Sequence, residues 1–186
     1  MFKNDYLKVA VTVPKVYLGN SMKNVLEMIQ IAKKASEATI VLFPELAISG
    51  YSLGDWHFNN QKLYEEKAAL KTMIDASNEQ IWIVGGVFEY LGSLYNCAYV
   101  LQNKKVLGIV PKSYLPRSKE FSEPRFFASG KDFLERIVEV ELFDQKTSFG
   151  SCLFYNSDYD VCFGVEICGD IWSVSSPNEN LYVRGA

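Results

Sequence analysis

Residues 7–43, LKVAVTVPKVYLGNSMKNVLEMIQIAKKASEATIVLF, contain two hydrophobic periods that alternate along the chain. Leu7–Val13 is short and rich in β-branched residues, which predicts a strand. Asn20–Ala35 has apolar residues at helical spacing, with Ser21 as the expected N-cap. Thr39–Phe43 is a continuous apolar run that a proline ends, as in a strand buried on both faces. Strand, helix and strand in this order favour an α/β fold.

The chain continues with a second helical pattern and then a series of strand-like segments. A glycine-containing loop leads to the expected helix Asn60–Ala76. Further strands are expected over Ile81–Phe88, Leu94–Leu101, Lys105–Val110, Ile137–Leu142, Ser151–Tyr155 and Asp160–Ile167. Two βα units followed by a meander predict a mixed sheet covered by helices. Pro111–Lys131 has no clear period and is long for a loop, and long ordered loops are often functional.

Composition narrows the class of protein before any motif is considered. With 186 residues and 48% hydrophobic residues, the chain is long enough for one sizeable core, so a single domain over residues 1–186 is expected. The 22 acidic and 19 basic residues are nearly balanced, which argues against a nucleic-acid partner. No targeting or membrane-spanning segment is visible, so we expect a cytoplasmic protein without a membrane partner. Four cysteines without a CxxC pair and a single histidine predict reduced thiols and no metal site.

Three polar or reactive residues follow directly on apolar strands, where α/β proteins tend to build their sites. Glu45, Lys112 and Cys168 each have an ordinary structural interpretation: a loop carboxylate, a solvated lysine and a small buried thiol. As a set they can divide catalytic work, because a carboxylate can take the proton of a thiol and an ammonium can stabilise the thiolate and an oxyanion. The only histidine, His57, is interpreted as a loop aromatic that packs beside Trp56, without a catalytic role.

Four motifs resemble one known family. They are FPELAISGY at 43–51, PKSYLP at 111–116 followed by Glu120-Phe121, RFFASG at 125–130 and GVEICGDIW at 164–172. Together they look like the glutaminase domain of glutamine-dependent NAD synthetases, in the carbon–nitrogen hydrolase (nitrilase) superfamily, whose signature is a Glu-Lys-Cys triad in this chain order. The resemblance covers nearly the whole chain. It implies a nitrilase-type αββα four-layer sandwich with mixed sheets, of which the C-terminal part is absent from this chain.

The resemblance also implies a mechanism. Cys168 would attack the carboxamide of glutamine, Glu45 would act as general base and later as proton donor to ammonia, and a γ-glutamyl thioester would form. Lys112 and the backbone N–H of Gly169 would hold the oxyanion. Further substrate-binding residues by this resemblance are Tyr51, Glu120 and Phe121, of which Glu120 matches a second carboxylate that helps to position substrate and lysine.

The same resemblance predicts partners and cofactors. The ammonia would pass to a C-terminal synthetase domain, absent from this chain, that amidates nicotinate adenine dinucleotide to NAD; ATP and magnesium are expected only there, and no cofactor in this segment. Uncovered sheet edges lead us to expect a homo-oligomer.

Two departures from the family pattern and two alternatives remain. Gly169 stands where the family usually has an acidic residue, and Arg117-Ser118-Lys119 stands where it commonly has a tyrosine. Contacts with substrate there are therefore expected to differ. The alternatives are a stand-alone carbon–nitrogen hydrolase acting on another small amide, and a non-catalytic remnant that serves as an interaction domain.

Overall fold

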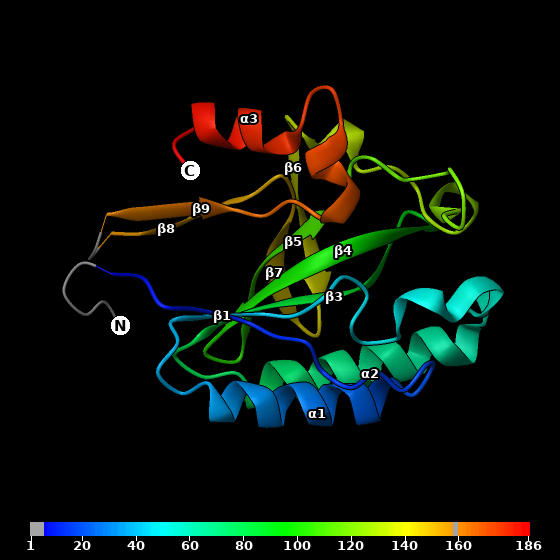
Figure 1. Ribbon diagram of the computed structural model, residues 1–186, viewed down its shortest axis with the longest axis horizontal. Helices are drawn as coiled ribbons and strands as arrows, with labels where there is room; N and C mark the ends of the chain where they lie inside the picture. Colours follow the sequence, from blue (N-terminus) through cyan, green and yellow to red (C-terminus); the bar gives the residue numbers. More distant parts are fainter. Residues whose placement is uncertain (1–5, 158–159) are drawn as a thin grey trace. The chain divides into compact units, whose positions relative to one another are not determined.

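The computed structural model describes residues 6–157 and 160–186 (Figure 1). The strands of the larger sheet lie in the order β1-β2-β3-β4-β5-β7-β6. Their bounds are β1 Val9–Val11, β2 Ile40–Leu42, β3 Ile81–Tyr90, β4 Ser93–Gln102, β5 Lys105–Pro111, β6 Ile137–Leu142 and β7 Gln145–Gly150. The pairs β1·β2, β2·β3 and β5·β7 are parallel and β6·β7 is antiparallel, so the sheet is mixed. The α/β class with a mixed sheet, predicted from the sequence, is confirmed.

The remaining elements are α-helices, short 3₁₀ segments and a second small sheet. Strands β8 Leu153–Asn156 and β9 Val161–Gly164 form an antiparallel pair outside the larger sheet. The helices are α1 Ser21–Lys34, α2 Asn60–Ala76 and α3 Pro177–Val183, and the 3₁₀ turns are η1 Tyr51–Phe58, η2 Glu123–Arg125, η3 Lys131–Phe133 and η4 Cys168–Trp172. None of the helices in the described ranges has the length and hydropathy needed to cross a membrane.

Most predicted elements occur close to their expected positions. The helix predicted over Asn60–Ala76 has these bounds, and the other predicted helix is α1. Its N-cap is Asn20 rather than the predicted Ser21, because the Asn20 side chain accepts a hydrogen bond from the backbone N–H of Lys23. Strand β7 has no counterpart among the predicted strands.

The chain divides into two compact units. The first comprises the residues up to Val87 together with Tyr99–Val106, and the second comprises Phe88–Ala98 together with Leu107–Ala186. In the first unit, α1 and α2 pack side by side and cover one face of its strands (Figure 1). The apolar faces of these helices are fully or almost fully buried: Val25, Met28, Ile29 and Ala32 in α1, and Ala69, Leu70, Met73 and Ile74 in α2. Helical spacing of these residues is what lets both helices bury one face against the sheet.

The core of the second unit is largely aromatic. Phe149 of β7 lies at its centre, with ring centroids 4.6 Å from Phe133, 5.2 Å from Tyr90 and 5.4 Å from Tyr95. Rings at such separations and tilted to one another are the arrangement that aromatic pairs prefer. The cluster joins β3, β4 and β7 to the turn η3, which begins directly after Gly130.

A buried carboxylate stabilises the first unit in a way that depends on pH. Glu66 of α2 is almost fully buried, and its Oε1 accepts a hydrogen bond of 2.8 Å from the backbone N–H of Val87 in β3. Burial raises the pKa of Glu66 from 4.5 to about 7, against the opposite influence of the Val87 N–H. The protonated form is therefore favoured in the folded chain.

Substitution Glu66→Gln is expected to stabilise the chain near neutral pH. Since the folded pKa lies above the unfolded one, the contribution of Glu66 is fully present below pH 4.5 and is lost as pH rises through about 7. The loss amounts to about 3 kcal/mol at most, and glutamine keeps the acceptor for Val87 without the charge. Urea unfolding of Glu66→Gln and of the original chain at several pH values should show a difference in the free energy of unfolding that grows between pH 4.5 and about 7. A difference independent of pH would contradict this, and Glu79→Gln, a change at an exposed glutamate of the same unit, is the control.

Candidate active site

Lys112 follows β5 directly and is fully buried in the second unit. Its backbone N–H donates to the Asn96 carbonyl at 2.8 Å, and its carbonyl accepts from the Gly130 N–H at 2.8 Å. Its Nζ lies 2.7 Å from Oε1 of Glu123, which is also buried. A buried ammonium needs such a partner, because an isolated charge is strongly disfavoured in a low-dielectric interior. The lysine is therefore held by its backbone on both sides and by a carboxylate at its tip.

Glu123 is a site residue that the sequence analysis missed. The predicted carboxylate for the lysine, Glu120, is exposed on the preceding loop, and Phe121 beside it is half-buried. The carboxylate placed on Lys112 is Glu123, which begins the turn η2 and is followed by Pro124. The only local signal was a Glu-Pro pair ahead of an aromatic run, which is weak. A contact of Glu120 with substrate stays a prediction.

Cys168 begins the turn η4, a few residues after β9, with its side chain exposed. Its φ of +44° lies in the left-handed region, which residues other than glycine rarely adopt and which is concentrated at functional sites. A Cβ built on Gly169 would lie 3.4 Å from the Tyr114 carbonyl oxygen and 3.7 Å from Cε of Lys112. The turn that presents the thiol thus lies against the lysine, so two of the three predicted catalytic residues come together in this unit.

Asp170 is a second residue that sequence reasoning did not assign to the site. Its carboxylate is buried and accepts hydrogen bonds from the backbone N–H groups of Ile167, Ser113 and Tyr114. Burial raises the pKa of Asp170 from 3.8 to about 6; these N–H groups and the charge of Lys112 act in the opposite direction.

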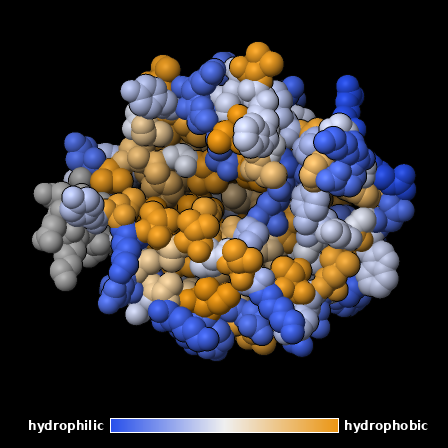
Figure 2. Space-filling view, viewed as in Figure 1, coloured by the Kyte–Doolittle hydropathy of each residue, from blue (hydrophilic) through white to orange (hydrophobic). Residues whose placement is uncertain are grey.

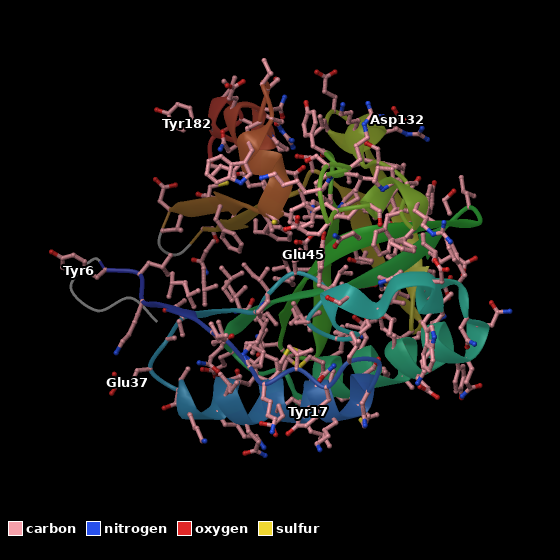
Figure 3. All side chains as sticks on the ribbon, turned by 45° about the vertical axis from the view of Figure 1, so that its right-hand side comes forward. Tyr6, Tyr17, Glu37, Glu45, Asp132 and Tyr182 are labelled. Carbon is pink, nitrogen blue, oxygen red and sulfur yellow. The ribbon has the colours of Figure 1, made fainter. Side chains whose placement is uncertain are left out.

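Glu45 lies in the first unit, on the segment between β2 and η1 (Figure 3). Its side chain is half-buried, and the next residue, Leu46, has a φ of +50°. The turn rests directly on β3: a Cβ at Gly85 would lie 2.3 Å from the Leu46 nitrogen and 2.5 Å from the Pro44 carbonyl oxygen. Only glycine permits this approach, since real Cβ atoms are not found so close to backbone atoms. The absence of a side chain at Gly85 in β3 therefore lets the backbone of the Glu45 turn pack directly against this strand.

The other predicted positions are distributed between the units. Tyr51 begins η1 in the first unit and is partly exposed, whereas Gly169 belongs to the second unit. His57 is almost fully buried in η1, and burial lowers its pKa to about 4, so it is neutral at neutral pH. All four cysteines are free thiols. Within residues 6–157 and 160–186, no group of three His, Cys, Asp or Glu side chains is arranged to hold a metal ion.

Comparison with known proteins identifies the family. Residues 14–182 match the sequence profile of the family described as carbon–nitrogen hydrolase, which is most of the chain. The chain belongs to the carbon–nitrogen hydrolase family. The resemblance noted from the motifs around Glu45, Lys112 and Cys168 is thereby confirmed at the level of the family.

Individual relatives of this carbon–nitrogen hydrolase chain agree with that assignment. The glutamine-dependent NAD(+) synthetase of Mycobacterium tuberculosis is 30% identical over 191 residues, an alignment that covers 100% of this chain and 28% of that protein. The solved structure of glutamine-dependent NAD+ synthetase from Acinetobacter baumannii, 27% identical, superimposes with a TM-score of 0.70 over 96% of this chain and 30% of that one. The chain thus spans less than a third of the length of these relatives.

A shorter relative shares the fold. The amidase from Nesterenkonia sp. AN1, 14% identical, superimposes with a TM-score of 0.72 over 100% of this chain and 64% of that one. That structure is described as showing covalent addition of the acetamide moiety of fluoroacetamide at its active site cysteine. At this identity the likeness shows the nitrilase-type fold alone, which agrees with the fold expected from the sequence.

Proposed function

We propose that this chain is the glutamine-hydrolysing part of a glutamine-dependent NAD synthetase and releases ammonia from glutamine through a cysteine thioester. The observation that carries the proposal is the buried Lys112–Glu123 pair beside the strained turn of Cys168. A fixed ammonium next to an exposed thiol is what nucleophilic catalysis on an amide requires, because it stabilises both the thiolate and the oxyanion. The similarity to an NAD synthetase over 100% of this chain and 28% of that protein supports glutamine as the substrate.

The proposed reaction has two stages. Glu45 takes the proton of the Cys168 thiol, the thiolate attacks the carboxamide carbon, and Lys112 with the Gly169 N–H stabilises the oxyanion. The carbon–nitrogen bond then breaks, ammonia leaves with a proton from Glu45, and the γ-glutamyl thioester remains on Cys168. In the second stage Glu45 activates water, which hydrolyses the thioester to glutamate and restores the thiol. The adduct described for the Nesterenkonia amidase, at that protein's active site cysteine, supports a nucleophile of this kind.

The substrate-binding, cofactor and partner assignments are part of the same proposal. Tyr51, Glu120 and Phe121 contact glutamine, and this segment itself uses no cofactor or metal. The ammonia goes to a synthetase domain that uses ATP and magnesium to form NAD in the cytoplasm.

Self-association is the second partner proposed. Strand β1 is an edge of the larger sheet, and valines in and after it are exposed, Val11 by 76% and Val13 by 91%. Figure 2 shows hydrophobic residues exposed on the face of the molecule that it presents. Uncovered apolar edges of this kind favour association. A sedimentation experiment that finds only the 21.1 kDa monomer over a wide concentration range would exclude a homo-oligomer.

Substrate preference is the measurement that tests the proposed function. Ammonia release by the chain is measured with glutamine, asparagine and acetamide, together with glutamate formation from glutamine. Glutamine is expected to be preferred by at least about 100-fold in kcat/KM, because a site that pairs the polar groups of its substrate rejects analogues that lack them. Equal or better rates with the other amides would favour the alternative of a general amide hydrolase, which the fold shared with an amidase suggests. Absence of ammonia with every amide would favour a non-catalytic role.

A further inference from the structure

Asp170 occupies a place in the fold that joins two parts of the candidate site. It lies two residues after Cys168 in η4 and is only 1% exposed, so its carboxylate lies inside the protein. Its Oδ1 accepts hydrogen bonds from the N–H groups of Tyr114, at 2.7 Å, and Ser113, at 3.1 Å. Its Oδ2 accepts from the N–H of Ile167 at 3.1 Å. One donor thus directly precedes Cys168, and the other two follow Lys112, more than fifty residues away in the sequence.

These hydrogen bonds bear on the geometry of the nucleophile. Cys168 adopts an unfavourable φ of +44°, which persists only if its surroundings hold it there. The Ile167 N–H bond holds the residue immediately before it, and the Ser113 and Tyr114 bonds tie the same turn to the strand end that carries the lysine. Hydrogen bonds from backbone N–H groups to a carboxylate are among the stronger ones in proteins. A single side chain therefore ties the turn that carries the thiol to the segment that follows the lysine.

From this arrangement we infer that Asp170 is a positioning residue for the hydrolytic reaction, acting through the backbone of the Cys168 turn and of residues 113–114. The inference rests on the proposed function in so far as it concerns turnover, but the arrangement of Cys168 beside Lys112 can be tested without substrate. The Asp170 carboxylate accepts hydrogen bonds from backbone N–H groups, and the charge of Lys112, which is paired with Glu123, acts on it.

The substitution that tests this is Asp170→Asn, which preserves the shape of the side chain. One of the two oxygens becomes an NH₂ group, and that donor faces a backbone N–H donor whichever way the amide is turned. The turn and the strand end are then no longer held together, so Lys112 stabilises the Cys168 thiolate less. The matched control is Glu66→Gln, which also removes a buried carboxylate but lies in the first unit.

Two readouts are measured on proteins whose circular dichroism matches the original chain. The first is the rate of Cys168 alkylation by iodoacetamide near pH 7, followed by peptide mass spectrometry. In Asp170→Asn this rate is expected to fall about tenfold, and the pH at which it is half-maximal is expected to rise. In Glu66→Gln the rate is expected to stay unchanged. With glutamine, kcat is expected to fall about 100-fold while KM changes little, because misplacement of reacting groups affects the transition state most.

The outcomes separate this inference from the proposed function. A folded Asp170→Asn variant with unaltered Cys168 alkylation overturns the positioning role, whatever its activity. Slower alkylation in a chain that releases no ammonia from glutamine supports the positioning role and contradicts the function. Should Asp170→Asn not fold, hydrogen exchange of the backbone amides in the original chain tests the positioning role instead. The amides of Ile167, Ser113 and Tyr114 are expected to exchange through one common opening. Exchange of the Tyr114 amide that is independent of the Ile167 amide overturns the inference.

Discussion

Replacing Cys168 by alanine is expected to lower ammonia release from glutamine by at least about 10³-fold. The thiol is the only group in the proposed mechanism that can form the thioester, and neither Glu45 nor Lys112 can take its place. Because the Cys168 side chain is exposed, its removal should leave the fold and the Lys112–Glu123 pair intact. Initial rates with glutamine, measured at the same protein concentration for both forms, check the prediction.

Cys162 provides the matched control for this change. It lies six residues earlier in β9, is half-buried, and has no part in the proposed site, so Cys162→Ala should retain activity. Cys168→Gly adds a test of the strained backbone: glycine accepts a φ of +44°, and this variant should be about 1 kcal/mol more stable than Cys168→Ala. If Cys168→Ala hydrolyses glutamine at the rate of the original chain, the nucleophile has been assigned wrongly.

Removal of Glu123 is expected to have the largest effect on stability. Glu123→Ala leaves the ammonium of Lys112 buried without its carboxylate partner, which costs about 3–5 kcal/mol of unfolding free energy. Denaturant unfolding of the variant and the original chain measures the difference. Activity should fall as well, because an unpaired lysine no longer has a fixed position next to Cys168.

Glu120→Ala is the matched control, since Glu120 is exposed three residues earlier on the same loop. This change should leave stability almost unaltered, and if Glu120 contacts glutamine as predicted from the family resemblance, it should raise KM. The double variant Lys112→Met, Glu123→Leu separates the two roles of the pair: it should recover much of the stability lost in Glu123→Ala while remaining inactive. Equal stability of Glu120→Ala and Glu123→Ala would contradict the ion pair.

The regular elements were predictable where a hydrophobic period is clear. Helix α2 and strands β3 to β6 follow such patterns closely. Strand β7, QKTSFG, was not predicted because its residues are mostly polar or small, and because its turn lacks the usual signal. Phe143 and Asp144 both have positive φ in the two-residue turn between β6 and β7, a conformation for which Asn-Gly is the common sequence. Residues 145–150 form a strand because they pair with β6 and because Phe149 is buried.

The candidate site was predictable only in part, for a similar reason. Glu45, Lys112 and Cys168 stand directly after apolar segments, which made them visible in the sequence. Glu123 reaches Lys112 through an irregular loop, where no period relates residues eleven positions apart. Asp170 finds two of its donors on a segment more than fifty residues away. Such contacts depend on the packing of the folded chain and have no local pattern.

The loop after Lys112 is closed at its base by the hydrogen bond from the Gly130 N–H to the Lys112 carbonyl. Its exposed tip comprises Arg117 to Glu120, of which Arg117-Ser118-Lys119 depart from the family pattern. The base of the loop is bonded to the backbone of Lys112, whereas the tip is exposed. Residues of the tip can therefore be exchanged to change recognition of the amide while the lysine keeps its position. Directed evolution of substrate preference has its best starting point in this tip.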